Sequence, residues 1–388
     1  MDLSALSANL RRTRIASGKS QGDVAEAAGL SRPGYRNIEA GEAAPRVDSL
    51  MRIASALGVR LEVLLEPARA LQRVRFRAQK RMTTREEVLV DVARRLDDYN
   101  ELEELLNNKS AFALARVREA IQKAKLKPGP ERARFAAREA RKALGLDGAA
   151  VADICSVLEN HGIKVLTSSF ASEGFFGLSV ADSDGGPAVV VNTWDRISVE
   201  RWIFTAVHEL AHLLLHLSAF DVAEDAEDKE QEVEADTFAA YFLMPEELFD
   251  AEFADSRGLG LVDRVLKIKR VFRVSYRTVL YRMQEKLSPD DRKKIWMTFA
   301  FQYKKRTGKS LGKADEPEGL RREAFTGRPP DRSAEEPDRL LAADFVEDRL
   351  RLLVRSAVDR ELISLGRAAE ILRIDLAEMR DLANSWVA

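Results

Sequence analysis

The stretch FTAVHELAHLLLH, residues 204–216, constrains the fold more than any other part of the chain, because it holds three of the four histidines. His208 and His212 are four residues apart, so on a helix they share one face, where two imidazoles can bind one zinc ion. Glu209 lies between them and can accept a proton from a water that the metal activates. The pattern therefore requires a helix here and a further metal ligand from elsewhere.

An acidic stretch that leads into a second helical pattern, ending near Leu243, offers the further ligand. Its glutamates, most of which we expect to be solvated, are Glu224, Glu227, Glu230, Glu232 and Glu234. Glu232 stands out because Asp236 lies four residues later on the same helical face. One of these two carboxylates can bind zinc while the other orients His208 through its free ring nitrogen. We expect Glu232 to be the ligand and Asp236 the orienting group, with Glu234 as the less favoured ligand.

His216 cannot join the same metal site on a straight helix, because it lies about 12 Å along the axis from His208. The metzincin pattern would need glycine and histidine where the chain has Leu215 and Ser218. We therefore expect His216 to support the site from the end of the helix. His216 and Tyr241 remain weak candidates for contact with the substrate or the transition state.

The stretch SQGDVAEAAGLSRPGYRNIEAG, residues 20–41, has the pattern of a helix-turn-helix motif. Gly29 suits a turn that needs positive φ, and Ser31 is a natural N-cap for the next helix. Pro33 is tolerated in a first helical turn, and Gly41 suits a helix end. The motif predicts two short helices, of which the second enters the DNA major groove.

The start of that second helix supplies most of the candidate base contacts. The candidate DNA-binding residues are Gln21, Ser31, Arg32, Pro33, Arg36 and Asn37. Arg36 can bind guanine with two hydrogen bonds, and Asn37 or Gln21 can pair with adenine. Basic residues at 69–81 can add phosphate contacts. The alternative is a domain used only for dimerisation or protein contacts.

The whole pattern predicts a mainly α fold with a small β-sheet. Short β-branched and aromatic runs between 163 and 192 predict the strands. Among them, FFGLSV (175–180) reads as a core strand, with a strand edge for an extended substrate as the alternative. We expect a helix-turn-helix domain at 1–67, a basic helical linker at 68–142, a zincin-like peptidase domain at 143–306, a flexible linker at 307–338 and a helical module at 339–388.

The last module has weaker signals. Its stretch LISLGRAAEILRIDLAEMRDL, residues 362–382, has helix-turn-helix spacing. Its part GRAAEILRI resembles small helical modules in regulators and antitoxins, but we favour a helical dimerisation or capping element.

Composition limits the remaining possibilities. The formal net charge is −1, so any DNA binding must come from a local arrangement of charge. The single cysteine, Cys155, allows no intramolecular disulfide, and its apolar surroundings predict a buried thiol. The chain shows neither a signal peptide nor an apolar run long enough to span a membrane. We expect a cytoplasmic protein, associated with the nucleoid when it is bound to DNA.

Two family resemblances extend these predictions. Residues 1–67 resemble the XRE (Cro/repressor-type) five-helix domain, which implies a homodimer on a double-stranded DNA operator. Residues 145–285, with FTAVHELAHLLLH followed by EVEADTFAAYFLMP, resemble the ImmA/IrrE family of zinc metallopeptidases. That resemblance implies one Zn²⁺ per chain on His208, His212 and Glu232, with Glu209 as general base. It also implies cleavage of a repressor or another regulatory protein, and the order of the two domains resembles a fused subgroup of regulators.

Two functions follow, from different classes. The first is a DNA-binding regulator with a zinc endopeptidase domain, whose substrates can include the chain itself. The second is a repressor or antitoxin-like autoregulator, whose peptidase fold acts as a sensor or partner-binding platform without significant proteolysis. The presence of both histidines, Glu232 and Glu209 favours the first, since a degenerate copy is expected to lose one of them.

Overall fold

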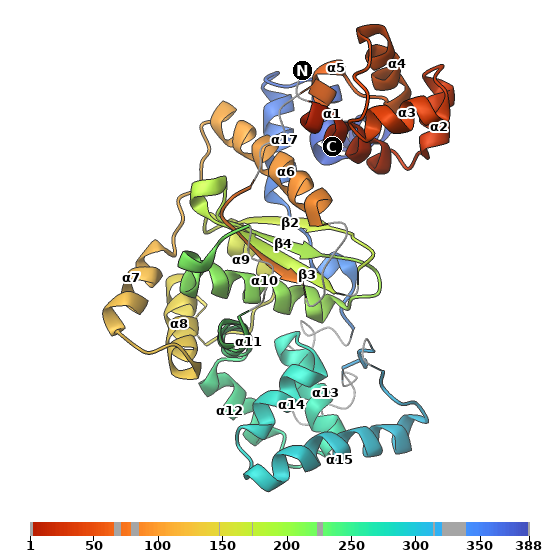
Figure 1. The fold of residues 1–388 in the computed structure, drawn as a ribbon. Helices are drawn as coiled ribbons and strands as arrows, with labels where there is room; N and C mark the ends of the chain where they lie inside the picture. Colours follow the sequence, from red (N-terminus) through yellow and green to blue (C-terminus); the bar gives the residue numbers. More distant parts are fainter. Residues whose placement is uncertain are drawn as a thin grey trace. The chain divides into compact units, whose positions relative to one another are not determined.

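A computed structural model describes residues 3–65, 71–78, 85–146, 148–172, 174–222, 228–312, 315–319 and 339–386. The chain divides into two compact units. The first comprises Met1–Leu71 and Thr83–Asp97, and the second comprises Gln72–Met82 and Asp98–Ala388. The expected fold class, mainly α with one small β-sheet, is confirmed (Figure 1).

The first unit contains the five expected short helices. They are α1 (Leu3–Ala16), α2 (Gln21–Ala27), α3 (Arg32–Glu39), α4 (Val47–Leu57) and α5 (Leu61–Leu65). Ser20 and Ser31 cap α2 and α3 through their side-chain oxygens, and Gly29 in the intervening turn has a φ of +65°. The core is apolar and includes Leu10, Val24, Tyr35, Ile53 and Leu64, all fully buried. Burial of these side chains holds together helices that are too short to be stable alone.

The second unit is built on a four-stranded sheet with the strand order β1-β3-β4-β2. The strands are β1 (Val74–Ala78), β2 (Lys164–Ser168), β3 (Phe175–Val180) and β4 (Ala188–Asn192). β2 and β4 are parallel, whereas β3 is antiparallel to both of its neighbours. The expected strand FFGLSV is therefore an internal strand, and β1 takes the edge of the sheet beside it.

The segment 68–142 departs from the expected helical linker. Its described part begins with β1 and continues with α6 (Arg85–Leu105), α7 (Ala115–Ala124) and α8 (Pro130–Ala143). The alternating apolar and basic residues of VRFRA suit a strand once a partner strand is available. β3 supplies that partner, so this stretch contributes to the sheet of the second unit.

The two helices that matter most for the site are α10 (Val199–Leu215) and α11 (Lys229–Leu243). α10 packs on β3 and β4, α11 packs on α10, and α8 packs on α11 (Figure 1). Nearly every residue of α10 is buried, and its apolar residues surround the axis, as expected of a helix covered on all sides. Polar groups on this helix are therefore held in a water-poor interior, where each needs a partner.

The remaining elements complete the second unit. They are α9 (Ile154–Glu159), η1 (Asp182–Asp184), η2 (Leu217–Ala219), α12 (Glu246–Asp255), α13 (Leu261–Phe272), α14 (Tyr276–Gln284), α15 (Pro289–Thr307), η4 (Ala342–Asp344), α17 (Arg349–Asp359), α18 (Leu365–Leu372) and α19 (Leu376–Ser385). Cys155 is buried and its thiol is free. Within the described residues, no helix combines the length and the apolar character needed to cross a membrane.

The C-terminal helices are attached to α6 and α9 by polar contacts. The backbone N–H groups of Asp348 and Arg349 donate to Glu159 at 3.1 Å each, so Glu159 holds the start of α17. Arg367 of α18 pairs with Asp98 at 2.6 Å and with Glu101 at 2.7 Å, both on α6. The expected last helical module is thus a packed part of the second unit.

The expected linker 307–338 is described only in part, since residues 313–314 and 320–338 lie outside the described structure. In the described part, the Glu316 carboxylate accepts hydrogen bonds of 2.8 Å from the Tyr276 N–H and the Ser275 hydroxyl. Glu316 also lies 3.3 Å from the Lys269 ammonium group. This piece of the expected linker is therefore fixed to α13 and α14.

Candidate metal centre

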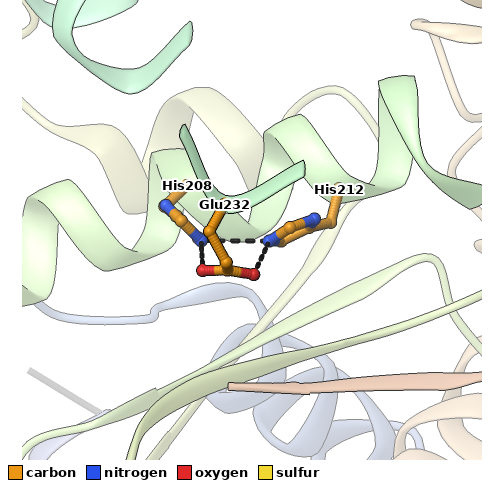
Figure 2. Close-up of side chains that lie close together, drawn as sticks. All are labelled: His208, His212 and Glu232. Atoms are coloured by element: carbon orange, nitrogen blue, oxygen red, sulfur yellow. Dashed lines mark hydrogen bonds and ion pairs between the residues drawn. The ribbon is translucent and has the colours of Figure 1, made fainter. Parts of the chain in front are cut away.

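Three side chains from α10 and α11 converge in the interior of the second unit. His208 Nε2 and His212 Nε2 lie 3.0 Å apart, and each lies 3.2 Å from a different carboxylate oxygen of Glu232 (Figure 2). Both histidines are fully buried. The candidate ligand atoms all lie within 4.8 Å of one another. The four-residue spacing on α10 and the close approach of α11 produce this cluster.

The chemistry of this cluster fits zinc. Two imidazole nitrogens and one carboxylate are a typical donor set, and three protein ligands leave one position for a substrate or water. Burial lowers the pKa of His212 well below its usual value, so its imidazole is neutral, as a metal ligand must be. Burial by itself would raise the pKa of Glu232, but the neighbouring His208 and His212 hold that pKa below the usual range. Glu232 contacts both His208 and His212, whereas Glu234 contacts His216.

Each histidine of the cluster has a partner for its second ring nitrogen. Asp236, which is half-exposed, places Oδ1 2.8 Å from His208 Nδ1. This is the contact expected for Asp236 from its position one helical turn after Glu232. It leaves His208 Nε2 free of its proton and directed at the cluster.

His212 is held by a longer chain of polar groups. His216 Nδ1 lies 2.9 Å from His212 Nδ1, and His216 Nε2 lies 2.9 Å from Glu234 Oε2. Glu234 accepts a hydrogen bond of 2.6 Å from Arg132 Nε and one of 3.0 Å from the Gly129 N–H. An ionised Glu234 accepts the proton of His216 Nε2, so His216 Nδ1 can accept the proton of His212 Nδ1. His212 then presents the lone pair of Nε2 to the cluster.

Charge supports this direction of the hydrogen bonds. Burial would raise the pKa of Glu234, but Arg132, His216 and the Gly129 N–H lower it to about 2. Burial lowers the pKa of His216, despite the neighbouring carboxylate of Glu234, so its ring is neutral near pH 7. His216 thus contacts His212 from the end of the helix, where we expected it to support the site. Its link to α8 through Glu234 and Arg132 was not foreseen, because no local pattern connects residues about a hundred positions apart.

Glu209, the expected general base, is fully buried between α10 and β3. Its Oε2 atom accepts a hydrogen bond of 2.9 Å from the Ser179 hydroxyl on β3. The strand can approach so closely because residue 177 is glycine. A Cβ at Gly177 would lie 2.6 Å from Thr205 Cγ2 and 3.4 Å from Glu209 Cγ. Ser179 is a site residue that the sequence alone did not indicate.

Arg75 of β1 also reaches the candidate metal centre. Its guanidinium lies 2.7 Å from Gln231 Oε1 and 3.2 Å from Glu232 Oε1. The Arg75 side chain is 10% exposed. The stretch around Arg75 reads as one of several basic runs, so only the pairing of β1 with β3 brings this residue to the site.

Tyr241, which we considered as a weak candidate for contact with the substrate, contacts residues at the end of α14. Its hydroxyl donates a hydrogen bond of 3.0 Å to Glu285 Oε2, beyond the end of α14. The Arg282 guanidinium lies 3.4 Å from the centre of its ring. The Tyr241 contacts therefore stabilise the packing of α11 against α14.

Five of the six candidate DNA-binding residues lie in α3 or at its N-cap. Ser31, Arg32, Pro33 and Arg36 are exposed, and Asn37 is half-buried. Ser31 accepts a hydrogen bond of 3.2 Å from the Gly34 N–H, so its hydroxyl already caps the helix. Exposed guanidinium and amide groups on the first turns of α3 have the chemistry needed to reach base edges.

Gln21 is tied to a buried carboxylate that the sequence did not single out. Its amide donates a hydrogen bond of 2.8 Å to Glu39, which also pairs with Arg14 through hydrogen bonds of 2.7 and 2.9 Å. Burial would raise the pKa of Glu39, but these partners hold it below the usual range. An ionised Glu39 therefore fixes α1 and α2 against α3, and Gln21 has a structural contact in addition to any contact with DNA.

Comparison with known families agrees with the two resemblances. Residues 158–284 match a peptidase family model described as the IrrE N-terminal-like domain, and residues 10–64 match a model described as helix-turn-helix. No curated protein matches the chain. The chain thus combines a helix-turn-helix domain, typical of proteins that bind double-stranded DNA, with a metallopeptidase-like domain. The candidate metal centre lies inside the second matched stretch, whereas β1 lies between the two.

Proposed function

We propose that this DNA-binding regulator is also a zinc-dependent endopeptidase. Its substrate would be a repressor or another regulatory protein, and it can also cleave its own chain. The observation that carries this proposal is the convergence of His208, His212 and Glu232 beside a buried Glu209. One zinc ion per chain would be held by the first three residues. The neutral imidazole of His212 and the ionised carboxylate of Glu232 suit the ion without further change.

The residues around the cluster have separate roles in this proposal. Zinc, when bound, supplies a Lewis acid that activates water and polarises the scissile carbonyl. Glu209 accepts a proton from the attacking water and delivers it to the leaving amine. Ser179 holds the Glu209 carboxylate through one oxygen, which fixes the direction of the other. Asp236 and His216 orient the two histidines.

The helix-turn-helix domain would bring this activity to an operator. Arg36 and Asn37 would contact base edges, with Arg32 beside them on the first turn of α3. We expect a homodimer on a two-fold operator, since one short recognition helix reads only a few base pairs. Such a protein acts in the cytoplasm, where its DNA lies.

The test compares new protein N-termini in cells that carry the wild type or Glu209→Gln, before and after stress. Glutamine keeps the shape of the side chain and removes the base, so zinc content and DNA binding should stay unchanged. A new terminus that requires Glu209 would name the substrate. If zinc is bound and no such terminus appears under several stresses, the repressor or sensor function without proteolysis is the better description.

A further inference from the structure

The segment 72–78 covers the edge of the strand that helps to form the candidate active site. β1 pairs antiparallel with β3, with Val74 opposite Val180 and Arg75 opposite Ser179. Ser179 is the residue that holds Glu209. Adding a strand to such a sheet edge is one of the common ways in which an extended peptide binds to a protein. In this chain the edge of β3 is already filled by the chain itself.

Several backbone contacts hold this segment in place before the strand begins. The N–H groups of Gln72 and Arg73 both donate to Asp184 Oδ2, at 2.7 and 3.0 Å. The Gln72 carbonyl accepts from the Val222 N–H at 2.9 Å, and the Arg73 carbonyl accepts from the Ala181 N–H at 3.0 Å. The entry to β1 is thus fixed to η1 on one side and to the turn after η2 on the other.

Arg75 extends this attachment into the candidate metal centre. Its guanidinium binds the Glu232 carboxylate oxygen that also faces His212, and it binds the neighbouring Gln231. A positive charge is thus held at the carboxylate of a candidate metal ligand. The strand therefore contributes both backbone pairing and a charged side chain to the same site.

We infer that β1 is an intramolecular occupant of the peptide-binding edge, and that it keeps the site closed to an extended protein substrate until it leaves β3. This inference rests on the proposed peptidase function. β1 lies outside both matched stretches, between residues 64 and 158. The chain thus places this strand, in sequence, between its DNA reader and its peptidase-like domain.

The first experiment measures occupancy without relying on catalysis. The zinc-loaded full chain is compared with Arg75→Pro, which removes the guanidinium and a backbone donor, and with Arg75→Ala, which removes only the guanidinium. Hydrogen exchange of the β3 amides is followed with and without a synthetic peptide of the sequence QRVRFRA, residues 72–78. We expect exchange in Arg75→Pro to rise at least about tenfold, the size of effect given by about one lost hydrogen bond, and the added peptide to restore protection.

The control for general loosening is Arg264→Ala on α13, a partly buried guanidinium that contacts Ser256 and the Phe253 carbonyl. It should leave β3 exchange unchanged. If Arg75→Pro fails to fold, Arg75→Ala still tests the charged contact. If β3 exchange is the same in wild type and both Arg75 variants, and the peptide does not bind, β1 is a permanent strand of the sheet and the inference is overturned.

The second experiment measures hydrolysis of a quenched-fluorescent peptide library of randomised sequence by the same proteins. We expect faster hydrolysis in both Arg75 variants than in wild type, and none when Glu209→Gln is added. Equal hydrolysis by wild type and variants would overturn the inference and leave the proposed function standing. Binding of the 72–78 peptide without hydrolysis by any variant would leave the occupancy standing and refute the peptidase. A Glu209-dependent cut within 74–78 of the wild type would make β1 a substrate and overturn its role as an occupant.

Discussion

At the scale of single residues, the two histidines of the candidate metal centre are supported in unequal ways. His208 is oriented by a half-exposed Asp236 on the adjacent helix. His212 is oriented by a buried chain that runs through His216 and Glu234 to Arg132. A buried chain excludes competing water, so we expect His212 to be the more rigid of the two ligands.

This difference leads to a prediction for His216→Ala. The substitution removes the acceptor for His212 Nδ1, so the imidazole loses its fixed orientation. Zinc affinity should fall about 10–100-fold, the usual effect of losing such a supporting group. Competition against a chelator of known affinity measures the change. His161→Ala is the matched control, because this fourth histidine contacts the Val157 carbonyl instead. Equal affinity in His216→Ala and wild type would contradict the orienting role.

Gly177 gives a second prediction at this scale. A Cβ there would lie 2.6 Å from Thr205 Cγ2 and 2.7 Å from the Val190 carbonyl, so β3 must shift away from α10 in Gly177→Ala. We expect a loss of about 1–3 kcal/mol in the free energy of unfolding, as for other overpacked interiors, together with reduced peptidase activity. Denaturant titration measures the first effect. Gly258→Ala is the control, since a Cβ at that position meets no atom within 4 Å.

The sequence predicted some of these residues and not others, for a physical reason. His208 and His212 are four residues apart on α10, and Glu232 and Asp236 are four residues apart on α11, so helical spacing places each pair on one face of its own helix. Ser179 and Arg75 come from separate strands, and only tertiary pairing brings them to α10. Their positions carry no local signal that distinguishes them from other serines and arginines.

At the scale of elements, the start of α17 depends on one buried carboxylate. Glu159 accepts the N–H groups of Asp348 and Arg349, yet burial outweighs these contacts and raises its pKa to about 7. The folded chain therefore binds a proton at Glu159 more tightly than the unfolded chain, in which the pKa is near the usual 4.5. The contribution of this group to stability is complete below about pH 4.5 and is lost as the pH rises through about 7.

Glu159→Gln tests this pH dependence. Glutamine can still accept the two N–H groups and cannot ionise. The melting temperature of the variant should rise relative to wild type between pH 5 and pH 8, measured by thermal unfolding at several pH values in one ionic strength. A difference between the two proteins that stays constant over that range would contradict the raised pKa.

Helix and strand prediction succeeded where the pattern is local. The five short helices of the first unit and the strands β2, β3 and β4 follow from glycine, serine and β-branched residues at the expected places. β1 was not predicted, because a short stretch of alternating basic and apolar residues becomes a strand only when the edge of a sheet is available to pair with it. The position of β3 inside the sheet follows from the same pairing.

At the scale of the whole molecule, the candidate DNA-binding residues and the candidate metal ligands are different residues, so the two proposed functions should be separable by substitution. In Arg36→Ala, affinity for DNA selected from genomic fragments by the wild type should fall, with a loss of about 1–3 kcal/mol, while zinc content stays constant. Fluorescence anisotropy at fixed salt measures the affinity. Glu209→Gln is the reciprocal control and should bind the same DNA as wild type. Unchanged DNA affinity in Arg36→Ala would remove this residue from the base contacts.

The two compact units are interleaved along the chain. The chain leaves the first unit after Leu71, returns to it at Thr83, and leaves it again after Asp97. Recombination at a single point in the gene therefore cannot transfer either unit intact. A crossover just after α5 would separate the DNA reader from Thr83–Asp97 of its own unit, and one after α6 would carry β1 away with the DNA reader. The reader, β1 and the peptidase-like domain are therefore expected to be inherited as one block and to diverge together.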